Sequence, residues 1–250
     1  MIASLILAAR FLTVLPVPGR EAEGAGALGR AAWWFPVVGL GLGAGLVALD
    51  RVLSLVFPSL LSALLVLSLW KVATGGIHLD GLADCLDGLG GRDVEHRRAI
   101  MKDRRIGVFG AIGLILFFLI ALMALSEMPY PARWRVLLLA PVLGRLAPLL
   151  VGVWFRTASP AHGLGGHFLG GVSGWAALVH LTGTAALAVW LLGAWGAVIG
   201  GGALVLVLLW SAFLARRFDG LTGDVLGSGV ELGELAVLLA GASLAHLRLI

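Results

Sequence analysis

The chain has 250 residues, of which 60% are hydrophobic and 13% are charged, and its formal net charge at pH 7 is +4. This composition excludes an ordinary soluble globular domain, because apolar runs long enough to cross about 30 Å of hydrocarbon recur along the whole length. We therefore expect an all-α fold, a polytopic membrane bundle of seven or eight spans that forms a single domain over residues 1–250.

The first apolar segment, residues 2–15, is short for a membrane span. It either crosses at a thin point, enters and leaves on one side, or lies in the interface. The predicted full spans are residues 31–50, 54–73, 106–126, 134–155, 172–192, 194–214 and 235–250. A polar link, residues 156–171, contains His162 and His167 and is either a lid over a site or a simple connection.

Four polar segments, near residues 16–30, 74–105, 156–171 and 215–233, are each separated from the next by two spans, so they must share one side of the membrane. They carry eleven of the 18 Lys and Arg residues, against four on the other side. The eleven are Arg20, Arg30, Arg92, Arg97, Arg98, Lys102, Arg104, Arg105, Arg156, Arg216 and Arg217. The positive-inside rule therefore places all four segments in the cytoplasm.

The most unusual stretch is residues 75–91, which reads Gly-Gly-Ile-His-Leu-Asp-Gly-Leu-Ala-Asp-Cys-Leu-Asp-Gly-Leu-Gly-Gly. In a helix Asp80, Asp84 and Asp87 stand at i, i+4 and i+7, within about 60° of one another. Three carboxylates on one face repel, and no Lys or Arg lies between them. We therefore expect a positive charge from outside this helix.

A divalent cation would supply that charge most simply. Hard carboxylate oxygens suit Mg²⁺ or Mn²⁺, whereas zinc or copper calls for more His and Cys than this stretch offers. Magnesium in turn indicates phosphate chemistry. The alternative is an amphipathic surface helix whose aspartates are solvated, although the glycines that frame the stretch are unusual for such a helix.

A second polar cluster, residues 101–110, stands where a cytoplasmic segment enters a span. Lys102 and Arg105 are suited to bind phosphate, and Asp103 is suited to complete a metal site. Juxtamembrane cations also follow the inside rule, but that rule explains neither Asp103 nor the glycines of the cluster. We interpret the cluster as part of the site.

A third cluster is the acidic, Gly-rich segment 216–234, which we expect to be a loop before the last span. Its Glu231 and Glu234 have a simple alternative role, in which they interact with the positive N-terminal end of the closing helix, whereas Asp224 does not. Arg145 is a separate anomaly, because it lies in the middle of a predicted span. A charge at that depth faces a polar cavity or a partner, so Arg145 is a candidate for binding an anionic substrate, with an aspartate as the alternative partner.

Together these motifs resemble the cobalamin synthase family, the membrane adenosylcobinamide-GDP ribazoletransferases. Three segments carry the resemblance: Gly-Gly-x-His-x-Asp-Gly-Leu-Ala-Asp-x-x-Asp-Gly at 75–88, Met101-Lys102-Asp103 with Arg105, Gly107, Phe109 and Gly110, and Gly220-Leu221-Thr222-Gly223-Asp224 with Gly227, Glu231 and Glu234. The resemblance runs nearly end to end, and Cys85 and Arg104 are mild departures from it.

The resemblance implies a Mg²⁺-dependent reaction in cobalamin biosynthesis. The adenosylcobinamide phosphate moiety of adenosylcobinamide-GDP is transferred to α-ribazole or its 5′-phosphate, with release of GMP. Spacing and composition by themselves reach only metal-assisted phosphoryl transfer at a membrane face.

The resemblance also implies roles for single residues, in a site built from segments 75–105 and 216–234. The metal ligands would be Asp80, Asp84, Asp87 and Asp103; the catalytic residues Asp80, Asp84, Asp87 and His78; and the substrate-binding residues Lys102, Arg105, Arg145, Thr222 and Asp224. His78 is either a general base or a residue that orients an aspartate.

Two alternatives stay open at this point. A CDP-alcohol phosphotransferase also uses glycine-spaced aspartates, but its signature has Ala-Arg where this chain has Asp84-Cys85. A transporter would use Arg145 and the acidic residues as a pathway. For each of these functions we expect a multi-pass protein of a bacterial or archaeal cytoplasmic membrane, with its site facing the cytoplasm. We expect contacts with lipid and no nucleic-acid partner, and we leave open association with other cobalamin-biosynthesis enzymes and homo-oligomerisation.

Overall fold

The computed structural model describes residues 1–155 and 168–250, and within these ranges the regular elements are helices. They are α1 (Ile2–Leu12), α2 (Ala27–Ala31), the 3₁₀ turn η1 (Ala32–Trp34), α3 (Phe35–Leu53), α4 (Ser59–Ala73), α5 (Ile77–Gly88), α6 (Val94–Met101), α7 (Val108–Glu127), α8 (Tyr130–Trp154), α10 (Gly174–Leu192), α11 (Ala194–Arg217) and α12 (Gly223–His246). The predicted all-α fold is confirmed. The predicted link with His162 and His167 lies outside the described residues in all but its last four positions.

The described residues contain six helical segments long and apolar enough to cross a membrane, or seven when α4 and α5 are counted as one broken span. Seven is the lower of the two predicted numbers. An eighth span would need α1, whose 11 residues extend about 16 Å and cannot cross the hydrocarbon layer. The described residues therefore agree with the lower of the two predicted numbers.

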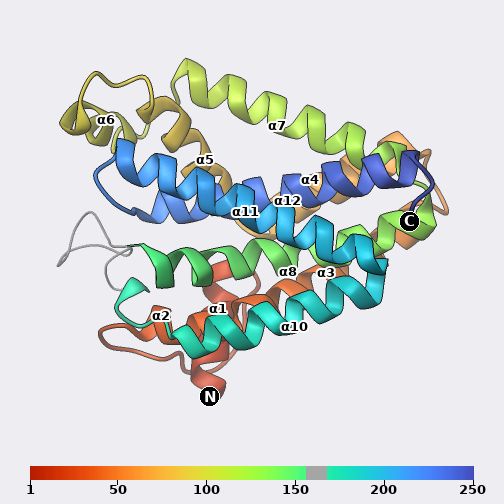
Figure 1. Ribbon diagram of the computed structural model, residues 1–250, viewed down its shortest axis with the longest axis horizontal. Coiled ribbons are helices and arrows are strands. Elements are labelled where there is room, and N and C mark those ends of the chain that lie inside the picture. The colour runs from red at the N-terminus through yellow and green to blue at the C-terminus, as the bar shows by residue number, and fades with distance from the viewer. Residues whose placement is uncertain (156–167) are drawn as a thin grey trace.

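Helix α8 forms the centre of the bundle and packs against α3, α10 and α12 (Figure 1). Of its most apolar stretch, 83% is buried, and Leu137, Leu143 and Leu146 are fully enclosed. A helix that is apolar all round belongs in the interior, and α8 meets that rule. Helix α7 has an even more apolar sequence but leaves Ile115 and Leu119 exposed at its surface, as expected of a helix that faces lipid.

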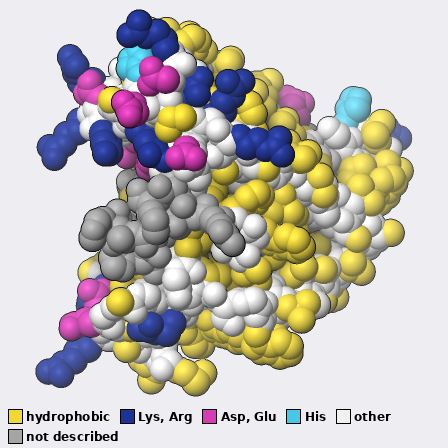
Figure 2. All heavy atoms as spheres, turned by 60° about the vertical axis from the view of Figure 1, so that its left-hand side comes forward, with side chains coloured by type: hydrophobic (Ala, Val, Ile, Leu, Met, Phe, Trp, Pro, Cys, Tyr) yellow, Lys and Arg dark blue, Asp and Glu magenta, His cyan; other side chains and the backbone are white. Residues whose placement is uncertain are grey.

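The polar segments gather at one end of the bundle. Figure 1 shows α6, the turn between α11 and α12, and the residues that flank 156–167 at the same end. Figure 2 shows most Lys, Arg, Asp and Glu side chains of the visible face around that end, while hydrophobic side chains cover most of the rest. The predicted placement of the four polar segments on one side is thus confirmed for their described residues.

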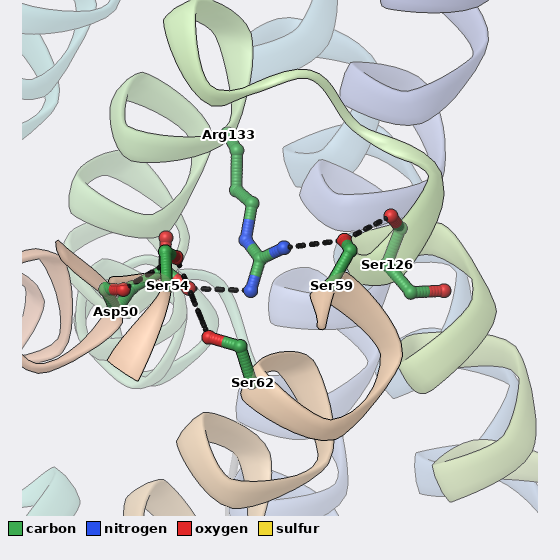
Figure 3. A network of polar contacts seen from close by, with 6 residues as sticks. All are labelled: Asp50, Ser54, Ser59, Ser62, Ser126 and Arg133. Carbon is green, nitrogen blue, oxygen red and sulfur yellow. Dashed lines mark hydrogen bonds and ion pairs between the residues drawn. The ribbon is translucent and has the colours of Figure 1, made fainter. Parts of the chain in front are cut away.

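A buried polar network ties helices together at the opposite end (Figure 3). The Arg133 guanidinium pairs with the Asp50 carboxylate and donates a hydrogen bond of 3.1 Å to the Ser59 hydroxyl. The Ser59 hydroxyl in turn donates to the carbonyl of Ser126 at 2.6 Å. Arg133 and Asp50 are almost fully buried. An unpaired charge would be costly at such a position, and the ion pair neutralises both charges.

The last helix begins earlier than expected. The sequence predicts a loop over 216–234, but α12 begins at Gly223, and the Thr222 side chain caps it by accepting a hydrogen bond of 3.2 Å from the N–H of Val225. This prediction was wrong because the glutamates in the first half of α12 are paired inside the bundle. Their polarity therefore does not exclude them from a buried helix.

Candidate active site

Two glycines turn the chain from α4 into α5. Gly75 and Gly76 have φ values of +64° and +68°, a conformation that L side chains rarely adopt. Their N–H groups donate to the carbonyls of Val72 and Lys71, which closes the end of α4 as a Schellman motif. Helix α5 consequently leaves α4 at an angle of 90°.

Helix α5 crosses α12 at very short range. A Cβ atom on Gly81 would come within 2.9 Å of the Asp224 Cα atom, and one on Gly227 would come within 3.3 Å of the His78 Cα atom. Glycine at these two positions therefore permits the crossing. It brings the first and third predicted motifs into direct contact.

A pocket of about 550 Å³ joins the first predicted motif to the second. Asp80 and Asp84 of α5 line one side of it, and Lys102, Asp103 and Arg105 line another. We call this the carboxylate pocket. Three carboxylates and three cations, the third cation being Arg104, thus line a space of the size that small-molecule sites have.

The carboxylates of this region repel one another. Burial, followed by the charges of Asp80, Asp224 and Asp87, raises the pKa of Asp84 to about 7. Asp103 shows the opposite effect, because the adjacent Arg105 guanidinium lowers the pKa of Asp103 to about 2. Their closest contact, between Arg105 Nη2 and Asp103 Oδ2, is 2.8 Å. Within the described residues, Asp84 has no ion pair of the kind that Asp103 makes with Arg105.

This arrangement fits a hard cation such as Mg²⁺. Among the described residues no three His, Cys, Asp or Glu side chains are grouped as a preformed metal cage. Mg²⁺ commonly binds through one or two carboxylates and completes its shell with water and substrate phosphates, so it needs no such cage. Asp80 and Asp84, which carry oxygen donors and an excess of negative charge, are the matching pair.

Asp87 has a structural role that the sequence did not predict. Its Oδ2 atom accepts a hydrogen bond of 2.7 Å from the N–H of Gly107, and its Oδ1 atom accepts one of 2.8 Å from the N–H of Gly110. Gly107 and Gly110 lie at the start of α7, so Asp87 caps this helix from a distance. A Cβ at either glycine would come within 2.4 Å of an Asp87 oxygen, which explains both glycines of the second motif. A role for Asp87 in metal binding stays a prediction.

Arg145 belongs to a buried cluster of four charges. Its guanidinium pairs with Glu234, while Lys71 Nζ lies 2.5 Å from Glu231 Oε2 and 2.8 Å from Glu234 Oε2. All four side chains are at most 7% exposed. A Cβ on Gly144 would come within 2.8 Å of the Glu234 side chain, so this glycine leaves room for the cluster.

The cluster changes how Arg145 is interpreted. The sequence predicted a charge with a partner at that depth, and the partner is a glutamate rather than an aspartate. Its role in binding substrate stays a prediction. Sequence reasoning missed Lys71, although a lysine among the apolar residues of α4 carries the same signal as Arg145.

His78 and Asp224 line a second pocket of about 240 Å³, which is mainly apolar. His78 stands about 200° around α5 from Asp80, so it faces away from the carboxylate pocket. Of the residues predicted to bind substrate, Lys102 and Arg105 lie at the carboxylate pocket, Asp224 at the second pocket, and Thr222 at the cap of α12.

Comparisons with known proteins agree over nearly the whole chain. A family model described as cobalamin-5-phosphate synthase matches residues 4–242. Relatives named adenosylcobinamide-GDP ribazoletransferase include proteins of Thiobacillus denitrificans, 39% identical over 98% of this chain and 97% of the relative, and of Chlorobium chlorochromatii, 37% identical over 98% and 97%. A third, from Geotalea daltonii, is 34% identical over 96% of both chains. No solved structure matches the chain.

Proposed function

This chain belongs to the cobalamin-5-phosphate synthase family, and we propose that it transfers the adenosylcobinamide phosphate moiety of adenosylcobinamide-GDP to α-ribazole or its 5′-phosphate. The names of the relatives supply the substrates. The carboxylate pocket is the observation in this chain that carries the proposal, because it brings the carboxylates of α5 into one pocket with the cations Lys102, Arg104 and Arg105, a combination suited to transfer of a phosphoryl group.

The reaction exchanges one bond to phosphorus for another. The 5′-hydroxyl oxygen of α-ribazole bonds to the phosphorus on the cobinamide side of the diphosphate. The bond from that phosphorus to the bridging oxygen breaks, and GMP leaves with the bridging oxygen. The hydroxyl proton passes to a neighbouring base or to water.

Lys102 and Arg105 would bind the diphosphate in this scheme. Both are exposed at the pocket, and Arg105 is held by Asp103 with its planar fork already oriented. Both side chains carry a positive charge that attracts phosphate oxygens. The two residues therefore orient the diphosphate and offset its charge as the bridging bond breaks.

Asp80 and Asp84 would hold Mg²⁺, which when bound polarises phosphoryl oxygens and neutralises developing charge. Their oxygen donors and the raised pKa of Asp84 support this assignment. Asp103 is a further candidate ligand because it lines the same pocket.

We also place the site in the cytoplasm, at the inner membrane. The four polar segments carry eleven Lys and Arg residues in the sequence, against four in the segments predicted for the other side, which supports this orientation under the positive-inside rule. The family match over residues 4–242 leaves the CDP-alcohol phosphotransferase and transporter alternatives without support.

The test uses the purified protein in lipid with adenosylcobinamide-GDP, α-ribazole and Mg²⁺, and measures GMP and the cobalamin product. We expect Asp84→Asn to lower turnover by about 100-fold or more, since it removes a charge from the reacting centre. Asp219→Asn is the matched control, because Asp219 lies in the exposed turn after α11 and outside the carboxylate pocket. Near-normal activity of Asp84→Asn at saturating Mg²⁺ would refute the proposal.

A further inference from the structure

We propose that the apolar pocket on the far side of α5 binds the aromatic base of α-ribazole. This pocket, of about 240 Å³, lies among α1, α3, α5, α8 and α12. The identity of the nucleoside rests on the proposed function, whereas the chemistry of the pocket rests on the structure. We call it the base pocket.

A row of stacked aromatic rings lines the base pocket. The ring centroids of Phe11 and Phe35 are 5.8 Å apart with planes 13° from parallel, and those of Phe35 and Phe168 are 5.8 Å apart at 25°. All three side chains line the pocket, together with Leu226 and Val230. Flat aromatic ligands gain stacking energy against such rings in addition to the burial of apolar area.

His78 adds a polar side chain to the mainly apolar lining of the base pocket. It is 6% exposed, lines the base pocket, and its Nδ1 atom makes no hydrogen bond within the part of the chain that the structure describes. A buried polar atom without a partner costs free energy, so it indicates a ligand that completes it. A nucleoside has ring nitrogens and ribose hydroxyls that can do so.

The volume selects the base rather than the corrinoid. At about 30 Å³ for each water molecule, the base pocket corresponds to about eight waters. A small aromatic ring system fits such a space, whereas the corrin macrocycle of adenosylcobinamide-GDP is far too large. The nucleoside is therefore the substrate that this pocket suits.

The two pockets meet where the reaction needs them to meet. Ile77, the first residue of α5, lines both the base pocket and the carboxylate pocket. A nucleoside whose base lies beside His78 can therefore extend its ribose around the start of α5 toward the diphosphate. The helix separates the two substrates, and its first turn is the place where they come together.

The test fills the base pocket with a side chain. Gly223 lines the pocket, is the first residue of α12, and has no atom within 4 Å of its ideal Cβ position. Gly223→Leu therefore adds volume without a clash. Gly174→Leu is the matched control, because Gly174 is the first residue of α10, follows a Ser cap, and is equally unobstructed but lies outside both pockets.

Two measurements are made in lipid nanodiscs. The first is the KM for each substrate; we expect Gly223→Leu to raise the KM for α-ribazole by about tenfold, the equivalent of one aromatic contact, and to leave the KM for adenosylcobinamide-GDP within about twofold. The second is the rise in Tm that α-ribazole alone produces, which reports binding without turnover. It should be present in the wild type and Gly174→Leu and absent in Gly223→Leu.

His78 is tested by a pair of variants. His78→Asn keeps a hydrogen-bonding group near the position of Nδ1 and should bind α-ribazole more tightly than His78→Leu. The proposal is overturned if both His78 variants and Gly223→Leu leave the KM for α-ribazole and the Tm rise unchanged. A second result would also overturn the proposal. If the Tm of the wild type depends on lipid chain length and the Tm of Gly223→Leu does not, while Gly223→Leu still responds to α-ribazole, then the pocket holds a lipid chain.

Failure of the proposed function gives a different result. A wild-type protein that shows the Tm rise with α-ribazole but produces no cobalamin refutes the proposed function and supports the base pocket. Turnover by the wild type with no change in any pocket variant refutes the base pocket and supports the function.

Discussion

The two aspartates Asp84 and Asp87 should respond to substitution in opposite ways. Asp87→Ala removes two charge-assisted hydrogen bonds, of 2.7 and 2.8 Å, from the start of α7. Loss of a capping side chain costs about 0.5–2 kcal/mol, and two bonds to a carboxylate place this case at about 2 kcal/mol. In a chain of this size the Tm should fall by about 4–8 °C.

Asp84→Asn should leave the Tm unchanged or raise it, depending on pH. The pKa of Asp84 is raised to about 7, so the folded state holds this proton more tightly than the unfolded state does. For an acid with a raised pKa, stability falls as pH rises from the unfolded pKa near 4 to the folded pKa near 7. The Tm advantage of the variant should therefore be small near pH 5, where only part of this loss has occurred, and larger near pH 8, where the repulsion among the carboxylates of the wild type is fully developed.

The assay is the Tm in lipid nanodiscs near pH 5 and pH 8, with and without Mg²⁺. The wild type and Asp87→Ala should both gain Tm with Mg²⁺, and Asp84→Asn should gain less, because ligand stabilisation depends on affinity. The reasoning is refuted if Asp87→Ala keeps the wild-type Tm without Mg²⁺ and loses the Mg²⁺ response. Asp87 would then be a metal ligand, as the sequence alone predicted.

Two further predictions concern the buried charges and the orientation. Arg145→Gln leaves Glu234 without its guanidinium partner and should lower the free energy of unfolding by about 3 kcal/mol or more. The rise in Tm that adenosylcobinamide-GDP produces should stay the same in this variant, and loss of that rise would show instead that Arg145 binds substrate. Glu95→Cys should react with a membrane-impermeant thiol reagent added on the cytoplasmic side, and the matched Glu127→Cys should react with it on the other side. Both positions are exposed, and the native Cys85 is buried and should not react. The reverse pattern would overturn the orientation.

Local spacing predicted the elements whose partners lie within the same helix. The i, i+4, i+7 spacing of the aspartates assumed a helix in the middle of residues 75–91, and the structure has one, α5. It also predicted one shared task for the three aspartates, yet Asp87 points to Gly107 and Gly110. That difference depends on where α7 starts relative to α5. No periodicity within the first motif contains this information.

Hydropathy placed the spans but misplaced the start of α12. Glu231 and Glu234 count as polar in any window, so the last span was expected to begin at residue 235. In the folded chain both glutamates are 1% exposed, because Lys71 and Arg145 neutralise them. Polarity marks a loop only when the charge stays unpaired, and pairing across three helices is a tertiary property.

One face of α12 connects the buried charges to the candidate site. Asp224, Gly227, Glu231 and Glu234 lie within about 80° of one another on this helix, so one stripe meets α5 first and then α4 and α8. Lys71 stands in the last turn of α4, immediately before the glycine bend, and its ion pairs hold that turn against α12. The direction of α5, and with it the position of Asp80 and Asp84, therefore depends on this contact. Buried ion pairs contribute little net stability compared with apolar packing, but they fix one register. A register error of one turn between α4 and α12 would shift the start of α5 along α12 by about 5 Å, and Asp80 and Asp84 would move with it.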